Sequence, residues 1–171
     1  MTLSEWIAAI RRAEDGSWIA RALVRAALIG EREAKTAATT RLRVRSGILR
    51  NSIGSAVRRV EGGAELVLTA STRYARIQEE GGTVRPRRGR YLAIPLRGQE
   101  GADRAGAFVL TAKSGKKFLA RRTQGGGLVL LAVLRESVTL RGRRYLRAGL
   151  DAAAAELREA IPQELEATLA R

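Results

Sequence analysis

The sequence predicts an α+β fold, with N-terminal and C-terminal helices packed on a central, mainly antiparallel β-sheet with long hairpin loops. Apolar residues recur at helical spacing near both chain ends and alternate in the middle, where Gly-rich breaks separate short segments. A length of 171 residues is usual for one domain, so we predict that residues 1–171 form a single domain. Its expected parts are the N-terminal helices (1–40), a basic β-rich middle (41–147) and a C-terminal helix (148–171).

The N-terminal part is expected to form two helices within residues 4–40. Apolar side chains such as Ile19 and Leu23 recur at helical spacing. The sequence Asp15-Gly16-Ser17 interrupts this pattern and offers Ser17 as the N-cap of the second helix. Residues 46–53 (SGILRNSI) predict one or two further helical turns, with Ser46 as the candidate cap.

The middle of the chain has the period of β-strands. Residues 54–70 alternate around Glu61-Gly62-Gly63 and predict a hairpin with a Gly-rich turn. The segment Tyr74–Gln78 fits either a short strand or a helical turn, and Gly81-Gly82 is expected to form a turn. A second hairpin should turn at Ser114-Gly115, and residues 124–127 should form a flexible turn. The later strands are expected at residues 91–96, 108–110 and 117–120, and residues 128–134 are expected to form an apolar strand or a buried segment.

The C-terminal helix is expected over residues 148–169. Its large apolar residues lie close to one stripe, which predicts a buried face; they are Leu150, Leu157, Ile161, Leu165 and Leu169. We expect Leu92 and Ile94, on a strand, to pack against Leu150 and Leu157. Pro162 should kink this helix or begin a second short segment.

Charge is distributed unevenly along the chain, whose formal net charge is +15. Residues 41–147 carry 24 basic and 7 acidic side chains, whereas residues 148–171 carry 2 basic and 5 acidic ones. Such a field attracts polyanions and acidic protein surfaces. High Arg and Ala usage with only 4 Lys also fits a GC-rich genome, which is the alternative explanation of the excess.

Several classes of protein are disfavoured by what the sequence lacks. Cysteine and histidine are absent, which removes disulfides, Cys/His zinc sites and the usual general base near neutral pH. No Walker or GxSxG motif occurs, so we expect no enzyme activity and no cofactor. Aromatic residues are 4% of the chain and scattered, which argues against a base-stacking platform and predicts a core of Leu, Ile, Val and Ala.

No membrane or secretory segment is expected. The segment from Met1 to Ile10 carries an acid and lacks an apolar core, and the longest apolar run, Gly127–Leu134, is too short to span a bilayer. We therefore expect a chain that is soluble and intracellular at synthesis.

Three charged clusters are candidate contact sites. Four arginines in six residues could clamp phosphates or carboxylates, or form a plain solvated loop; they are Arg85, Arg87, Arg88 and Arg90. A basic hairpin could insert into a groove or channel, or be a charged edge that blocks strand pairing; its cations are Lys113, Lys116, Lys117, Arg121 and Arg122. Adjacent residues in an extended chain point to opposite faces, so Glu79 and Glu80 are interpreted as intersubunit acids rather than as a shared metal site.

Five segments in this order resemble a known family: RSGILRNSI, YARIQEEGGTV, YLAIPL, FVLTAKSGKKFLA and LLAVLRESVTLRGRRYL. Over roughly residues 41–160 the chain is similar to bacteriophage virion-morphogenesis proteins, the Mu G-like and related head–tail joining or tail-completion proteins. Two departures are visible: residues 140–145 lack the proline common in relatives, and Gln78 stands where many relatives have His.

The resemblance implies a structural component of a phage or phage-like particle at the head–tail junction or tail end. It implies a homo-oligomeric ring, expected to be a hexamer, in the virion neck or tail after assembly in the host cytoplasm. The implied partners are other neck or tail proteins, such as tail tube, terminator or connector, and DNA in the lumen, with no membrane. The alternative is a nucleic-acid-binding protein that uses the basic middle segment.

Overall fold

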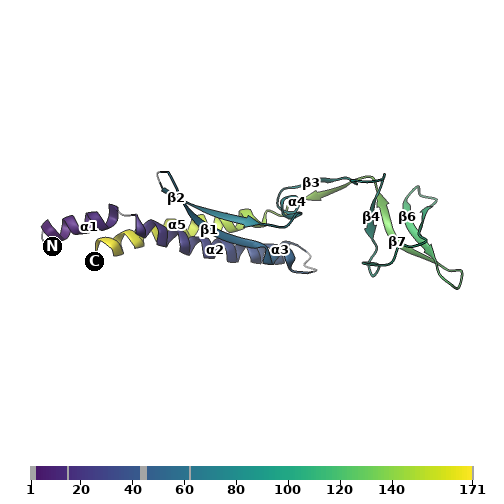
Figure 1. Ribbon diagram of the computed structural model, residues 1–171, viewed down its shortest axis with the longest axis horizontal. Helices are drawn as coiled ribbons and strands as arrows, with labels where there is room; N and C mark the ends of the chain where they lie inside the picture. Colours follow the sequence, from purple (N-terminus) through teal and green to yellow (C-terminus); the bar gives the residue numbers. More distant parts are fainter. Residues whose placement is uncertain (1–2, 15, 43–45, 62, 171) are drawn as a thin grey trace. The chain divides into compact units, whose positions relative to one another are not determined.

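A computed structural model describes residues 3–14, 16–42, 46–61 and 63–170, and the chain divides into two compact units (Figure 1). The helical unit comprises residues 1–81 and 141–171, and the sheet unit comprises residues 82–140. The predicted α+β class, with helices at both chain ends and antiparallel strands between them, is confirmed. The expectation of a single domain concerns whether the two units unfold together, and it stays a prediction.

The helical unit contains five helices and a hairpin among its described residues. They are α1 (Leu3–Glu14), α2 (Ser17–Arg41), α3 (Ile48–Asn51), β1 (Ile53–Val60), β2 (Gly63–Ala70), α4 (Ala75–Glu80) and α5 (Tyr145–Leu169). The expected helix pair and hairpin are confirmed, and the segment Tyr74–Gln78 falls mainly in helix α4 rather than in a strand. Asp15 and Gly62, which belong to two of the expected breaks, lie outside the described residues.

The helix caps differ from the sequence prediction. Gly16 (φ 68°) precedes α2 and Gly47 (φ 69°) precedes α3, whereas Ser17 is already the first residue of its helix and Ser46 lies outside the next one. Glycine adopts this left-handed conformation without a Cβ clash, so the chain can enter each helix sharply. The predicted serine caps are therefore wrong by one residue.

Helices α2 and α5 pack side by side and antiparallel (Figure 1). Arg21 Nε lies 2.8 Å from Glu164 Oε2 near one end of the pair, and Arg41 Nη1 donates to Arg144 O at 2.9 Å near the other. Most buried residues of the two helices are small, and the larger ones are Leu23, Tyr145 and Thr168. The small ones are Ala22, Ala26, Ala27, Gly30, Ala34, Ala37 and Ala38 on α2, and Gly149, Ala153 and Ala160 on α5. This composition explains how a chain with few aromatic residues builds a core.

The two helices approach most closely at Gly30 and Gly149. A Cβ on Gly149 would lie 2.4 Å from Gly30 O and 2.8 Å from Ala34 Cβ. A Cβ on Gly30 would lie 2.9 Å from Gly149 O. Neither position has room for a side chain, so backbone contact sets the distance between the helices.

The buried face of α5 is not the leucine stripe that the sequence predicted. Gly149, Ala153 and Ala160 are buried, whereas Leu150 is 42% exposed and Ile161 is 38% exposed. The close approach of α2 at Gly149 leaves no space there for a side chain, and the remaining stripe residues, Leu157, Leu165 and Leu169, are half-buried. Helix α5 also begins at Tyr145 and runs through Pro162, so no second segment begins at this proline.

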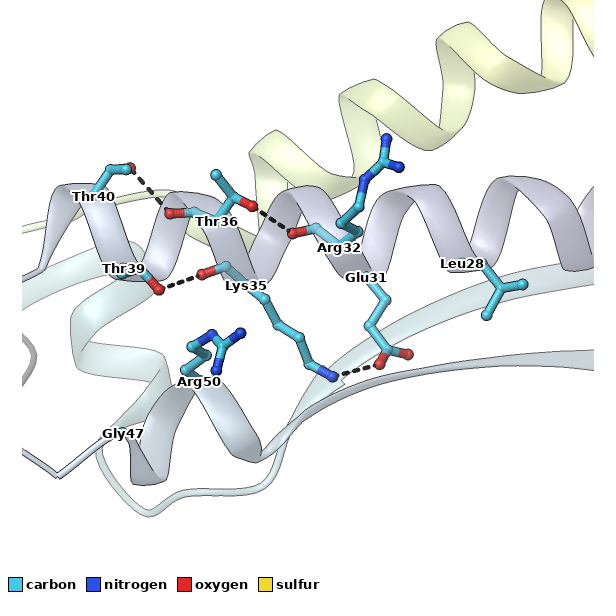
Figure 2. Close-up of a pocket in the computed structure, with 9 residues that line it drawn as sticks. All are labelled: Leu28, Glu31, Arg32, Lys35, Thr36, Thr39, Thr40, Gly47 and Arg50. Atoms are coloured by element: carbon cyan, nitrogen blue, oxygen red, sulfur yellow. Dashed lines mark hydrogen bonds and ion pairs between the residues drawn. The ribbon is translucent and has the colours of Figure 1, made fainter.

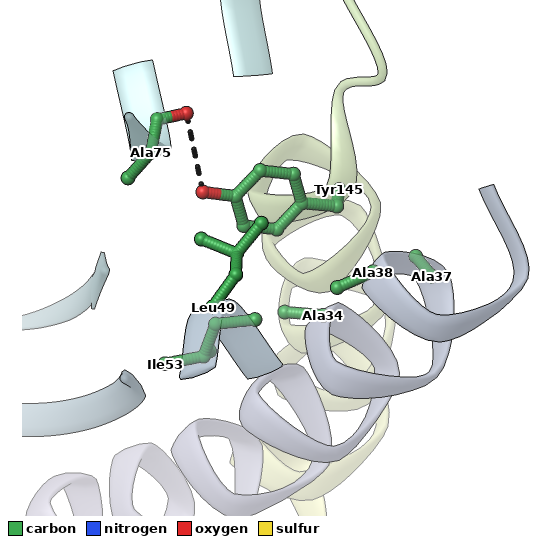
Figure 3. Close-up of a cluster of buried hydrophobic side chains, with 7 residues drawn as sticks. All are labelled: Ala34, Ala37, Ala38, Leu49, Ile53, Ala75 and Tyr145. Atoms are coloured by element: carbon green, nitrogen blue, oxygen red, sulfur yellow. Dashed lines mark hydrogen bonds between the residues drawn. The ribbon is translucent and has the colours of Figure 1, made fainter. Parts of the chain in front are cut away.

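The hairpin and the short helices complete the core of the helical unit. Strands β1 and β2 pair from Ile53↔Ala70 to Val60↔Gly63, and both strands contact α2. Figure 3 shows the cluster beneath them, in which α3, α4 and α5 meet the end of α2; it comprises Ala34, Ala37, Ala38, Leu49, Ile53, Ala75 and Tyr145. Tyr145 is fully buried, and its hydroxyl donates to Ala75 O at 3.3 Å.

The sheet unit contains one four-stranded sheet of order β4-β7-β6-β5. Its strands agree with those predicted: β4 (Leu92–Pro95), β5 (Phe108–Thr111), β6 (Lys117–Arg122) and β7 (Leu128–Arg135). The pairing of β3 (Gly81–Val84) with β8 (Val138–Arg141) was not predicted. Gly81 and Gly82 have φ of 80° and 137° and begin β3, so the expected Gly-Gly turn is wrong.

The expected packing of Leu92 and Ile94 against Leu150 and Leu157 stays a prediction, because the two pairs belong to different units. Leu92 and Ile94 lie on β4, which pairs with β7 inside the sheet unit. Leu150 and Leu157 belong to the helical unit, where α2 is the principal partner of their helix. The prediction assumed one central sheet, whereas the strands are divided among three.

Replacement of Gly149 by alanine tests the close helix contact. We expect Gly149→Ala to destabilise the protein by about 1–3 kcal/mol, because the new Cβ overlaps Gly30 O and forces the helices apart. Gly54→Ala is the matched control, since a Cβ there meets nothing within 4 Å. Urea unfolding measures both free energies, and equal stability of the two variants would contradict the proposed contact.

The buried hydroxyl of Tyr145 predicts a loss of stability at high pH. Burial, with a contribution from the charge of Glu79, raises the pKa of Tyr145 from 10.0 to about 12. Below about pH 10 the hydroxyl is protonated in both states; between about pH 10 and 12 only the unfolded chain loses the proton, so stability falls as the pH rises.

Tyr145→Phe should reduce this decline in the free energy of unfolding, as measured by urea titrations at about pH 8 and about pH 11. At about pH 8 the variant should lose about 0.5–1.5 kcal/mol, the typical value of one hydrogen bond. An unchanged pH dependence in the variant would show that another group causes the decline.

Candidate interaction site

The four arginines of the basic arm, residues 85–90, all lie exposed between β3 and β4. Arg90 Nε is 3.2 Å from Glu136 Oε1, and its guanidinium lies 5.5 Å from the centre of the Tyr91 ring. Within residues 82–140, which the structure describes completely, Arg85, Arg87 and Arg88 have no side-chain hydrogen bond or ion pair. Their charge is therefore available for an outside contact.

The basic hairpin lies on β5, β6 and the turn between them. Lys117 Nζ donates to Tyr91 Oη at 2.5 Å and lies 4.8 Å from the centre of that ring, and Arg121 Nη1 is 3.6 Å from Asp103 Oδ2. The other three cations, Lys113, Lys116 and Arg122, are exposed. Because Arg90 and Lys117 both contact Tyr91, the structure brings the end of the arm close to the hairpin, which the sequence did not predict.

The sheet unit has a large excess of positive charge. Residues 82–140 contain 12 Lys and Arg but only 3 acids. All three acids already have partners: Asp103 with Arg121, Glu136 with Arg90, and Glu100, which accepts from Gly98 N at 2.8 Å. The remaining charge has to be neutralised by solvent ions or by a bound acidic surface.

One face of this sheet is apolar across all four strands. The register pairs Ile94 with Val133, Val133 with Phe118, and Phe118 with Leu110, and paired residues point to the same side. We call this surface the open sheet face: Ile94, Phe108, Leu110, Phe118, Leu130 and Val133. Residues 82–140 contain no helix to cover it. Ile94 and Phe108 are 39% and 37% exposed, the other four residues are half-buried, and Ala120, which the register places between Phe108 and Leu130, is buried.

The two acids before Gly81 have roles within their own unit. The carboxylate of Glu79 accepts from Leu146 N at 2.8 Å and from Arg147 N at 3.0 Å, so it caps the first turn of α5. Glu80 forms an exposed ion pair with Arg76 at 2.9 Å. The intersubunit role of both acids stays a prediction, and the capping role of Glu79 was missed.

The start of α5 is also held by backbone contacts with the end of α4. Arg143 N donates to Gln78 O at 2.8 Å and Arg144 N donates to Glu79 O at 3.0 Å. A Cβ on Gly142 would lie 2.6 Å from Glu80 O, so only glycine permits this approach. Arg144 itself has a φ of 49°. No Ser, Thr, Asp or Asn immediately precedes the start of α5, and this absence was the one sequence signal that another part of the chain supplies the cap.

A groove between α2 and α3 is shown in Figure 2. Glu31 accepts from Lys35 Nζ at 2.6 Å and from the hydroxyl of Ser55 at 2.7 Å, and these hydrogen bonds lower the pKa of its carboxyl. The hydroxyls of Thr36 and Thr39 donate to carbonyls of their own helix. These polar groups of the groove are thus used internally, and Glu31 joins α2 to β1 through Ser55.

Among the residues that the structure describes, no cluster of three or more acidic side chains could hold a metal ion. None of the helices in the described ranges is long and apolar enough to cross a membrane.

The chain is similar to a known protein family over part of its length. Residues 7–81 match the family described as "HK97-gp10_like: Bacteriophage HK97-gp10, putative tail-component", which covers less than half of the chain. No curated protein and no solved structure matches the chain. The match ends where the sheet unit begins. It supports a phage tail or morphogenesis family and a structural role in a tail, and it does not support the Mu G-like family specifically.

Removal of the Glu79 carboxylate tests its role as a cap. We expect Glu79→Ala to lower the free energy of unfolding by about 0.5–2 kcal/mol, because two N–H groups of α5 lose their acceptor. Glu80→Ala is the matched control and should cost at most about 0.5 kcal/mol, the value of an exposed i,i+4 pair. Equal losses in chemical denaturation would refute the capping role.

Proposed function

We propose that this protein is a structural subunit of a phage or phage-like tail, placed at the head–tail junction or tail end, where it forms a homo-oligomeric ring. The observation that carries the proposal is the tail-component match over residues 7–81. The matched segment includes α2, the hairpin and α4, which contribute most of the core of the helical unit. The proposed ring is a hexamer.

The sheet unit is the contact element in this proposal. It carries 12 basic and 3 acidic side chains, and its arm lies in solvent. Arginine forks pair well with carboxylates, so an acidic face of a neighbouring tail protein or subunit is the expected partner. A lumen through which DNA slides favours weak phosphate contacts, so we assign the arm to protein rather than to DNA.

Binding of nucleic acid is the second candidate, and the positive charge of the sheet unit favours it. Binding through several phosphates has to weaken steeply with salt, with a slope of about −0.9 per phosphate in a plot of log K against log salt. The nucleic-acid function would be refuted if the protein does not bind duplex DNA, or if its affinity for duplex DNA does not fall as the salt concentration rises.

The location of the protein tests the proposal directly. Gold-labelled antibodies against the chain should bind purified particles at one position, the neck or the tail end. Particles that lack the protein, with all of it free in the lysate, would contradict a structural role.

Neutralisation of the basic arm tests what it contacts. We expect the variant with Ser at Arg85, Arg87, Arg88 and Arg90 to fold normally, within about 0.5 kcal/mol of wild type, because these side chains are exposed. Head–tail joining should fail in a complementation assay that counts complete particles. The same change at four exposed arginines of the helical unit, Arg58, Arg59, Arg73 and Arg76, is the charge-matched control and should leave joining intact.

The two candidate contacts give different results in this assay. Failed joining assigns the arm to a protein surface, whereas complete particles that fail to deliver DNA would assign it to DNA. Normal joining and normal delivery would leave the arm as a solvated loop and refute both.

A further inference from the structure

Helix α5 presents an acidic surface on which two of the three acids have no partner in the described residues. Residues spaced by three or four positions on the outer side of the helix are exposed, and we call them the acidic helix face: Asp151, Ala155, Glu159, Pro162 and Glu166. Asp151 pairs with Arg147 at 2.9 Å. Glu159 and Glu166 have no hydrogen bond or ion pair within the described part of the chain. The residues between these acids are small, which lets another surface approach.

The open sheet face has the opposite charge. The register places Arg122 beside Leu128 and Arg135 beside Leu92, on the same side as the apolar residues. These two arginines lie at the ends of strands β6 and β7, which run in opposite directions, so they mark opposite ends of the face. Both are exposed, and neither has a partner within residues 82–140. An apolar surface with a cation at each end favours an acidic occupant.

We propose that the acidic helix face of one subunit docks on the open sheet face of the next. A helix that covers one face of an antiparallel sheet is an ordinary layer arrangement, and the sheet unit lacks such a layer. Two sheet units cannot cover one another, because each carries an excess of nine positive charges. Since the two complementary surfaces lie on one chain, the contact is heterologous and repeats from subunit to subunit until a ring closes. This inference rests on the proposed ring and names its surfaces.

Charge reversal on each side tests the contact. The helix-reversed variant carries Glu159→Lys and Glu166→Lys, and the sheet-reversed variant carries Arg122→Glu and Arg135→Glu. All four side chains are exposed, so circular dichroism and thermal unfolding should match wild type. Wild type should form an oligomer in light scattering and analytical ultracentrifugation. Each variant alone should self-associate at least about tenfold more weakly, because like charges then face one another.

A mixture of the two variants provides the decisive measurement. In an equimolar mixture each reversed surface meets the opposite charge on the other chain, so the oligomer should return to the wild-type size with the two chains alternating. The control variant, Glu14→Lys with Glu61→Lys, makes the same charge change as the helix-reversed variant at exposed sites and should associate normally. Wild-type association of either reversed variant, or a mixture that associates no better than its components, would overturn the proposal.

Two further outcomes are decisive. A monomeric wild type at every concentration, or an oligomer that disappears after nuclease treatment, would also overturn it. Restoration in the mixture, combined with absence of the protein from particles, would uphold the docking and refute the tail function. Antibody labelling of tails, combined with normal assembly of the charge-reversed variants, would uphold the tail function and refute the docking.

Discussion

The backbone contact between Gly30 and Gly149 is the constraint on which the helical unit depends. It holds α2 and α5 so close that no side chain fits at these two positions, and the buried residues around them on both helices are mostly alanine. The same contact sets the end of α2 against the start of α5, where Tyr145 fills the core and donates its hydroxyl to α4. Large apolar residues of α5, such as Leu150 and Ile161, remain partly exposed as a consequence.

The start of α5 connects this core to the sheet unit along the chain. Glu79 caps the helix, Gly142 lets two backbone segments cross, and Arg143 and Arg144 donate their N–H groups to α4. Each contact joins residues more than sixty positions apart in sequence, one before and one after the sheet unit along the chain. The helical unit contains 14 of the 17 acids of the chain together with 20 basic side chains, whereas the sheet unit contains 12 basic side chains and 3 acids. The unpaired acids of α5 and the unpaired cations of the sheet unit are the basis of the proposed contact between copies.

Local pattern was sufficient to predict most elements but not their partners. Helical spacing in residues 17–41 and alternation in residues 53–70 found α2 and the first hairpin, because each signal depends on near neighbours. The β3–β8 pairing joins distant segments, and the glycines of β3 have the composition of a turn, so no local signal revealed it. The helical spacing of the apolar residues in α5 correctly predicted that the helix has a buried face. It indicated the wrong face, because close packing of the two helices selects small residues instead. The exposed basic arm and the basic hairpin of the candidate site could be identified from the sequence. The cap from Glu79 required the three-dimensional structure, and the continuous apolar row of the open sheet face required the strand register.

Amide hydrogen exchange of the free protein tests most directly whether the close helix pair is the stable centre of the fold. The account predicts that amides of α2 and α5 around Gly30 and Gly149 exchange most slowly, at the rate set by global unfolding. Amides of β4 to β7 should exchange earlier, because the sheet unit has one layer and an uncovered apolar face. Protection of β6 and β7 equal to or greater than that of α2 and α5 in the monomeric protein would contradict this account.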